Sequence, residues 1–149
     1  MPSGRSWPDR MLHELALSTA MVLTTVSIHG VGLHFLRGFV DNVGRHRPHG
    51  ALNISRKGLM MAAVVLGFYV LHGLEIWLYA VVYLLIGAVE NLREGVYFST
   101  ISYGAIGYTD IHISQNWKLV GAIEGINGVL MLGWSTAFFV TTMVRIRRW

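Results

Sequence analysis

The sequence predicts an all-α membrane protein with three transmembrane helices and one short re-entrant helix. The chain has 149 residues, of which 53% are hydrophobic and only 13% are charged. Soluble proteins carry roughly a quarter charged residues, and the mean hydropathy here is +0.49. The charges lie at the ends of apolar runs, where they avoid the cost of entering hydrocarbon. The net charge of +4 is spread over these short flanks, which suits lipid headgroups and forms no nucleic-acid-binding face.

Three apolar segments are long enough to cross a bilayer, which takes about 20 residues in a helix. The first is predicted over residues 15–36, after an N-terminal segment of residues 1–14. The second starts near Leu59 and the third near Leu119, and both belong to one unit of residues 59–144. The first span could instead be a secretory signal, but its apolar core is too long and no cleavage site follows it.

A fourth apolar stretch, residues 92–104, is too short to span and is predicted to be a re-entrant helix. Irregular backbone after such a helix is tolerated in a membrane only where it is buried in protein or lines water. The segment therefore predicts a loop at membrane depth, between the second and third spans.

Basic residues predict the orientation. The loop over residues 37–58 carries five lysines and arginines with one acid, and the tail over residues 145–149 carries three arginines. Short loops rich in Lys and Arg stay cytoplasmic. We therefore expect the N-terminus and the re-entrant segment outside, and the C-terminus in the cytoplasm.

The most informative motif runs from Tyr97 to Asp110, Tyr-Phe-Ser-Thr-Ile-Ser-Tyr-Gly-Ala-Ile-Gly-Tyr-Thr-Asp, between two spanning segments. It resembles the pore helix and selectivity filter of the tetrameric potassium channels, whose filter Thr-Val-Gly-Tyr-Gly is followed by Asp. The resemblance covers about residues 59–144 and is closest to small bacterial channels with a two-helix pore, here with an extra N-terminal helix. It implies a homotetramer in a bacterial inner membrane, with K⁺ or Na⁺ as permeant ions and no bound cofactor.

The resemblance also implies roles for individual residues. Backbone carbonyls of the filter, residues 105–109, would replace the hydration shell of the ion, and helix carbonyls near Ser102 to Gly104 would face the pore axis. The residues implied as ion-coordinating are Ala105, Ile106, Gly107, Tyr108 and Thr109. Those implied as supporting the filter are Tyr97, Ser102, Asp110, Trp117 and Glu124, and those implied at the cavity or at a hinge are Asn127, Gly128 and Gly133. For the two glycines, close helix packing is the alternative.

Two departures from the filter pattern predict weaker potassium selectivity. Ala105 stands at the position of a threonine and lacks the hydroxyl that would serve the innermost ion site. Thr109 stands at the position of a glycine, and a β-branched residue adopts positive φ only with strain. These departures leave a second hypothesis open, a non-conducting subunit that keeps the fold and has a structural role among other membrane subunits.

Polar residues within the spans are costly and normally face protein or water. His72 and Glu75 are three residues apart and share a helix face, which favours a hydrogen-bonded strut to the first span through His29 or Ser27. A proton-sensitive pair is the alternative, and His29 with His72 could also ligate a b-type haem. The histidine spacing is not that of a metal-ligand set, so no metal site is predicted. No nucleophile–base pattern indicates an enzyme.

Overall fold

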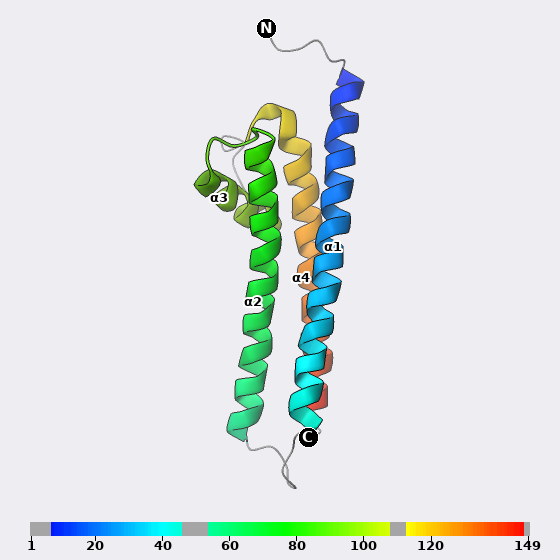
Figure 1. Cartoon of the computed structure of the whole chain (residues 1–149), viewed down its shortest axis with the longest axis vertical. Helices are drawn as coiled ribbons and strands as arrows, with labels where there is room; N and C mark the ends of the chain where they lie inside the picture. The colour runs from blue at the N-terminus through cyan, green and yellow to red at the C-terminus, as the bar shows by residue number, and fades with distance from the viewer. Residues whose placement is uncertain (1–6, 46–53, 108–112, 148–149) are drawn as a thin grey trace.

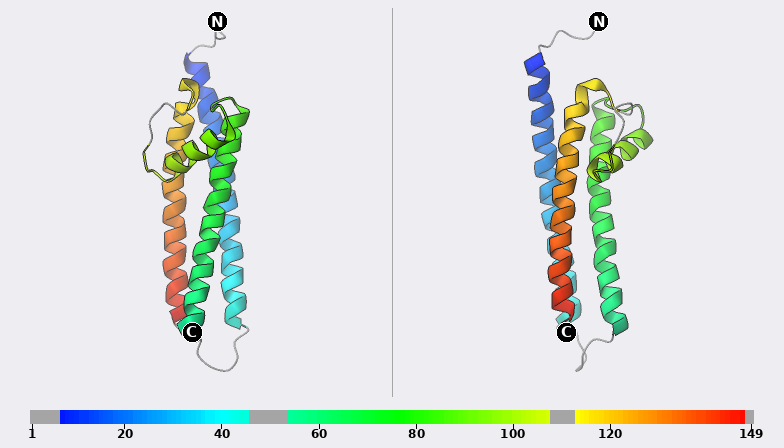
Figure 2. Two further views of the ribbon diagram at one scale, coloured as in Figure 1. Left: turned by 90° about the vertical axis from the view of Figure 1, so that its left-hand side faces the viewer. Right: turned by 180° about the vertical axis from the view of Figure 1, so that it is seen from behind.

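The computed structural model describes residues 7–45, 54–107 and 113–147. It confirms the all-α class, because these residues form helices joined by turns and contain no strand. The long helices are α1 (Trp7–Arg45), α2 (Ile54–Leu85) and α4 (Lys118–Arg147), and each is long and apolar enough to cross a membrane. The short helix α3 (Leu92–Tyr103) follows α2, and the 3₁₀ turn η2 (Gln115–Trp117) leads into α4. The three long helices run side by side, and α3 lies at one end of the bundle (Figures 1 and 2).

The long helices extend beyond the predicted apolar segments. The first begins at Trp7 and ends at Arg45, where the sequence predicted residues 15–36. Pro8 falls in its first turn, where a missing N–H costs nothing, and no helix-breaking residue ends the helix at Leu36. Most of the predicted loop over residues 37–58 is therefore helical, because α1 continues to Arg45 and α2 already starts at Ile54.

The second helix ends at Leu85, in a Schellman cap. Ala88 N–H donates to the carbonyl of Tyr83 at 2.8 Å, and Gly87 N–H donates to that of Leu84 at 3.2 Å. Gly87 has φ +67°, the left-handed conformation that this cap requires and that glycine adopts at least cost. The turn then meets the start of α4, since Ser114 N–H donates to Ala88 O at 2.9 Å.

Two apolar clusters fill the bundle, one at each end. The cluster beside α3 contains Tyr83 and Phe98, whose rings are edge-to-face at 5.4 Å, together with Met21, Tyr79 and Val120. The other lies at the end opposite α3 and is built from Leu33, Val40, Val64, Phe68, Leu71 and Ile146. The first cluster places α3 against the long helices by burying Phe98 completely.

Basic residues gather at the end of the bundle opposite α3. The end of α1, the start of α2 and the end of α4 lie together there (Figure 1). Arg145 pairs with Asp41 at 2.6 Å, and Lys57 Nζ donates to Arg147 O at 3.4 Å. The two regions that the sequence assigned to one side of the membrane thus meet in space.

Candidate pore site

The short helix α3 begins with a side-chain cap. Asn91 Oδ1 accepts the N–H of Glu94 at 3.0 Å, so one of the free donors at the helix start is satisfied. Glu94 lies in the first turn, where its negative charge complements the positive end of the helix dipole. The sequence therefore fixes where this helix starts, only a few residues after α2 ends.

Buried serines attach α3 to its neighbours. Ser99 Oγ contacts both Glu124 Oε1 at 2.5 Å and Ile76 O at 3.0 Å, which lie on α4 and α2 respectively. Ser102 Oγ donates to Gly121 O of α4 at 2.6 Å. Ser99 and Ser102 are three residues apart and share one face of α3, so this face is polar but fully paired.

Glu124 lies behind α3, and its side chain is fully buried. Besides the contact with Ser99, it accepts a hydrogen bond from the hydroxyl of Tyr83 at 2.6 Å. Three elements therefore meet at this carboxylate: α2 through Tyr83, α3 through Ser99, and α4 itself. This is the position that bracing of the short helix requires, because the Glu124 side chain is enclosed by protein.

Gly128 lets the end of α3 approach the backbone of α4. A Cβ at Gly128 would lie 2.0 Å from Tyr103 O, and one at Gly125 would lie 3.2 Å from Ser102 O. No backbone atom can yield by the amount that the first contact demands. Gly128 is therefore a position of close helix packing, the alternative that the sequence left open for this glycine. At Gly133, by contrast, a Cβ would meet no atom within 4 Å.

The end of α3 repeats the cap found at the end of α2, with an alanine in place of the glycine. Ile106 N–H donates to Ile101 O and Ala105 N–H donates to Ser102 O, both at 3.0 Å. Ala105 has φ +52°, the left-handed conformation of this cap. The carbonyl of Ser102 therefore accepts one hydrogen bond within this cap. Alanine tolerates this φ at some cost, whereas a β-branched threonine would be a strong outlier there.

The turn after α3 lies beside an open groove. Ile106 is 72% exposed, and Gly107 has φ +94°. The groove has a volume of about 750 Å³ and is mostly apolar, with walls from α2, α3 and α4. Thr100, Gly104 and Ile106 line it on the side of the turn. Two predicted filter residues, Tyr108 and Thr109, lie outside the described residues, as does Asp110, which was predicted to support the filter.

The two aromatic residues predicted to support the filter lie apart. Tyr97 is 53% exposed on α3 and does not join the buried cluster around Phe98. Trp117 lies in η2 and packs, partly buried, against that cluster at the start of α4. Trp117 thus packs against the same cluster that holds Phe98 of α3.

Asn127 faces the interior of the bundle. Its amide nitrogen donates to Thr25 Oγ1 of α1 at 2.8 Å and lies 3.5 Å from the hydroxyl of Tyr79 on α2. Its side chain is 2% exposed. Within one chain the amide of Asn127 is therefore engaged by its neighbours, because α1 covers this face of α4.

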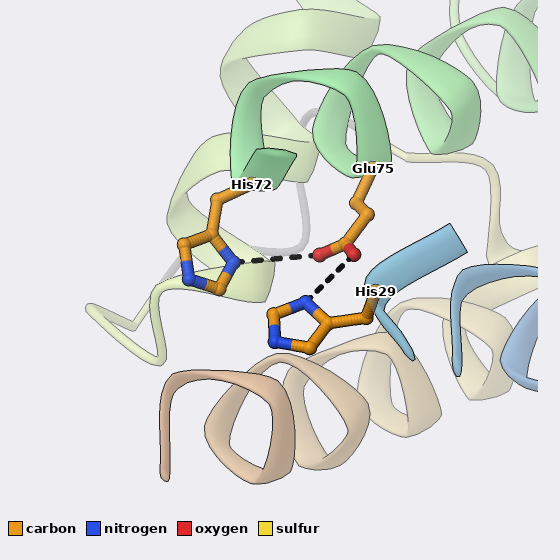
Figure 3. Close-up of side chains that lie close together, drawn as sticks. All are labelled: His29, His72 and Glu75. Carbon is orange, nitrogen blue, oxygen red and sulfur yellow. Dashed lines mark hydrogen bonds and ion pairs between the residues drawn. The ribbon is translucent and has the colours of Figure 1, made fainter. Parts of the chain in front are cut away.

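A second buried carboxylate, Glu75 of α2, has partners on α1, on α2 itself and on α3. His29 Nδ1 of α1 lies 2.9 Å from Glu75 Oε1, and His72 Nδ1 lies 3.4 Å from Glu75 Oε2 (Figure 3). The hydroxyl of Tyr103, at the end of α3, donates to Glu75 Oε2 and lies 3.0 Å from His72 Nδ1. Ser135 of α4 contacts both histidines through their Nε2 atoms. We call these five residues the histidine cluster.

The sequence had pointed to only part of the histidine cluster. His72, Glu75 and, as one of two options, His29 were singled out, whereas Ser27 bonds to its own helix at Leu23 O. Tyr103 and Ser135 were not predicted to join it, because the sequence shows only that each places a polar group in an apolar helix. The rings of His29 and His72 lie 5.2 Å apart and share the same partners, which leaves no space for a haem between them.

Comparison with known proteins gives one match. A family model described as "Ion channel" matches residues 69–145, just over half of the chain. These residues cover most of α2, all of α3 and η2, and nearly all of α4, whereas α1 lies outside the match. No curated protein and no solved structure matches the chain. With three helices of spanning length and this match, the chain is a multi-pass membrane protein and belongs to the ion channel family.

Proposed function

We propose that this protein is one subunit of a homotetrameric cation channel with a potassium-channel-like pore. The observation that carries the proposal is the family match over residues 69–145, which is centred on a short helix between two spanning helices. One chain supplies a quarter of the pore, and cyclic symmetry places four turns around one axis. The backbone carbonyls of Ala105, Ile106, Gly107, Tyr108 and Thr109 coordinate the permeant K⁺ or Na⁺.

The proposed site is supported by the way α3 is held. Ser99, Ser102 and Glu124 fix α3 to α2 and α4, and the backbone carbonyl of its last residue packs closely against Gly128. The turn that follows is next to an open groove and keeps Ile106 exposed. Such exposure of an apolar residue in one subunit suits burial against the other three.

The altered filter makes the proposed channel less selective for potassium than one with an intact filter. Ala105 offers its carbonyl but no hydroxyl, and its left-handed backbone suits alanine better than threonine. Reversal potentials in liposomes under potassium and sodium gradients test this, together with the mass of the assembly in mild detergent. The expected result is a tetramer with a modest preference for potassium.

The variant that tests the filter directly is Thr109→Gly, because a threonine at 105 would strain the left-handed backbone that ends α3. Thr109→Gly should sharpen the potassium preference, because it frees the backbone at 109. A wild type that is already strongly selective would refute the effect of Ala105 and Thr109 on selectivity. The other candidate is a non-conducting subunit, which the substitutions at Ala105 and Thr109 favour. A single copy that assembles with unrelated chains and conducts no ions would support it.

The proposed orientation in a bacterial inner membrane places the N-terminus and α3 outside and the C-terminus in the cytoplasm. It is supported by the basic residues that meet at the end opposite α3. Single cysteines at Asn53 and Ser114 should react with impermeant reagents from opposite sides of the membrane. Reaction from the same side would exclude this orientation.

A further inference from the structure

We propose that His29, His72 and Glu75 form a binding site for a divalent transition-metal ion of the zinc type. The site lies where α1 meets the pore unit, away from residues 105–109. It is independent of the proposed conduction, because its metal would be held by the chain and would not pass through the pore. Three features of the histidine cluster support the site: the convergence of ligand atoms, the number of available hydrogens, and access from the groove.

The ligand atoms converge from two helices. One ligand atom from each of His29, His72 and Glu75 lies within 4.8 Å of the others. The Nδ1 atoms of the two histidines face the two carboxylate oxygens of Glu75, as Figure 3 shows. Two imidazoles and one carboxylate form a donor set that binds Zn²⁺ and similar ions and leaves a position open for a further ligand.

Without a metal, the histidine cluster is short of one hydrogen. Besides the longer His72–Glu75 contact at 3.4 Å, its members make five closer polar contacts: His29–Glu75, His29–Ser135, Ser135–His72, His72–Tyr103 and Tyr103–Glu75. Each contact needs a hydrogen between its two atoms. Two neutral imidazoles and two hydroxyls supply one hydrogen each, which makes four. With both imidazoles neutral, one of the five contacts therefore has no hydrogen and brings two acceptor atoms together. Two unpaired acceptors in a buried site destabilise the fold.

A bound metal removes this conflict. It would take the Nδ1 lone pairs of His29 and His72, so that both rings carry their hydrogens on Nε2. Both Nε2 atoms point at Ser135 Oγ, at 3.2 Å and 3.1 Å, and a hydroxyl oxygen can accept two hydrogen bonds. Metal-bound histidines typically donate their other N–H to such a partner. Tyr103 still donates to Glu75, and the metal takes the place of the hydrogen that was missing between two acceptors.

An ion can reach the cluster from the groove. His29 and Glu75 are fully buried, but the side chain of His72 is 13% exposed. His72, Tyr103 and Ser135 all line the groove of about 750 Å³. The groove thus provides a path to the open side of the site without separation of the long helices. No ligand spacing along the chain indicates this site, because its two histidines come from different helices.

The test measures zinc binding to the purified full-length protein in detergent. After removal of metals with a chelator and incubation with Zn²⁺, elemental analysis should find about one zinc per chain. The thermal midpoint should rise with the concentration of Zn²⁺, because the metal binds only the folded state. Ser135→Ala keeps the ligands and should weaken binding about 10–100-fold, as expected for loss of a supporting hydrogen bond.

His72→Gln should abolish stoichiometric binding, whereas His34→Gln should leave it unchanged, since His34 is an exposed histidine of α1 outside the cluster. Absence of bound zinc in the wild type, with no shift in its thermal midpoint, would refute the site and leave the extra hydrogen as a proton on one imidazole. Equal binding by the His72→Gln variant would refute it as well. Neither measurement depends on ion flux, so failure of the channel proposal would be seen separately.

Discussion

Two buried carboxylates hold the short helix α3, and they do so with different chemistry. Glu124 is bonded to the hydroxyls of Tyr83 and Ser99, all within the unit that matches the ion channel family. Glu75 is bonded to Tyr103 of α3 but also to two imidazoles, one of which comes from α1. The hydroxyls around Glu124 complete hydrogen bonds, whereas the imidazoles beside Glu75 are also strong ligands for transition metals. Glu124 thus links α2, α3 and α4, while Glu75 links α3 to α1 through the cluster in which we propose a metal site.

Both carboxylates depend on the position of α3, so the largest effect is expected where its backbone touches α4. Gly128→Ala would place a Cβ 2.0 Å from Tyr103 O and push α3 away from Glu75 and Glu124 together. Overpacking of this kind typically costs about 1–3 kcal/mol or more. The thermal midpoint of the purified assembly should fall clearly. Gly133→Ala is the matched control, because a Cβ there meets no atom within 4 Å, and an equal fall in both variants would contradict this reading of Gly128.

A change in ion permeability separates the two carboxylates. Glu124→Leu and Glu75→Leu each remove an acceptor from buried donors, which costs about 1–3 kcal/mol per stranded group. Both should therefore lower the thermal midpoint. Only Glu124→Leu should also change the relative permeability to potassium and sodium, because only Glu124 fixes the body of α3 between α2 and α4.

The glutamine variants serve as controls for that comparison. Glu75→Gln and Glu124→Gln keep a hydrogen-bonding group of the same shape and should each be milder than the leucine change at the same position. A shift in reversal potential with Glu75→Gln, at unchanged assembly, would place Glu75 in the ion pathway and remove the distinction between the two carboxylates.

The sequence by itself determined the class of fold and the order of its helices. Apolar runs of membrane length must form helices in lipid, since no other open structure satisfies the backbone there. The run of residues 92–104 was too short to span and is the helix α3 in the structure. The motif from Tyr97 to Asp110 identified the channel resemblance, and the family match confirms an ion channel.

Tertiary structure decided the roles of the polar residues and glycines. Asn127 donates a hydrogen bond to Thr25, because α1 covers that face of α4. Gly128 lies in close contact with the backbone at the end of α3. The histidine cluster draws on all four helices, so no spacing along the chain could reveal it. Helical periodicity fixes which residues share a face, but it does not fix which helix lies against that face. Only the packing of α1, α3 and α4 around α2 brought two histidines and a carboxylate to one point.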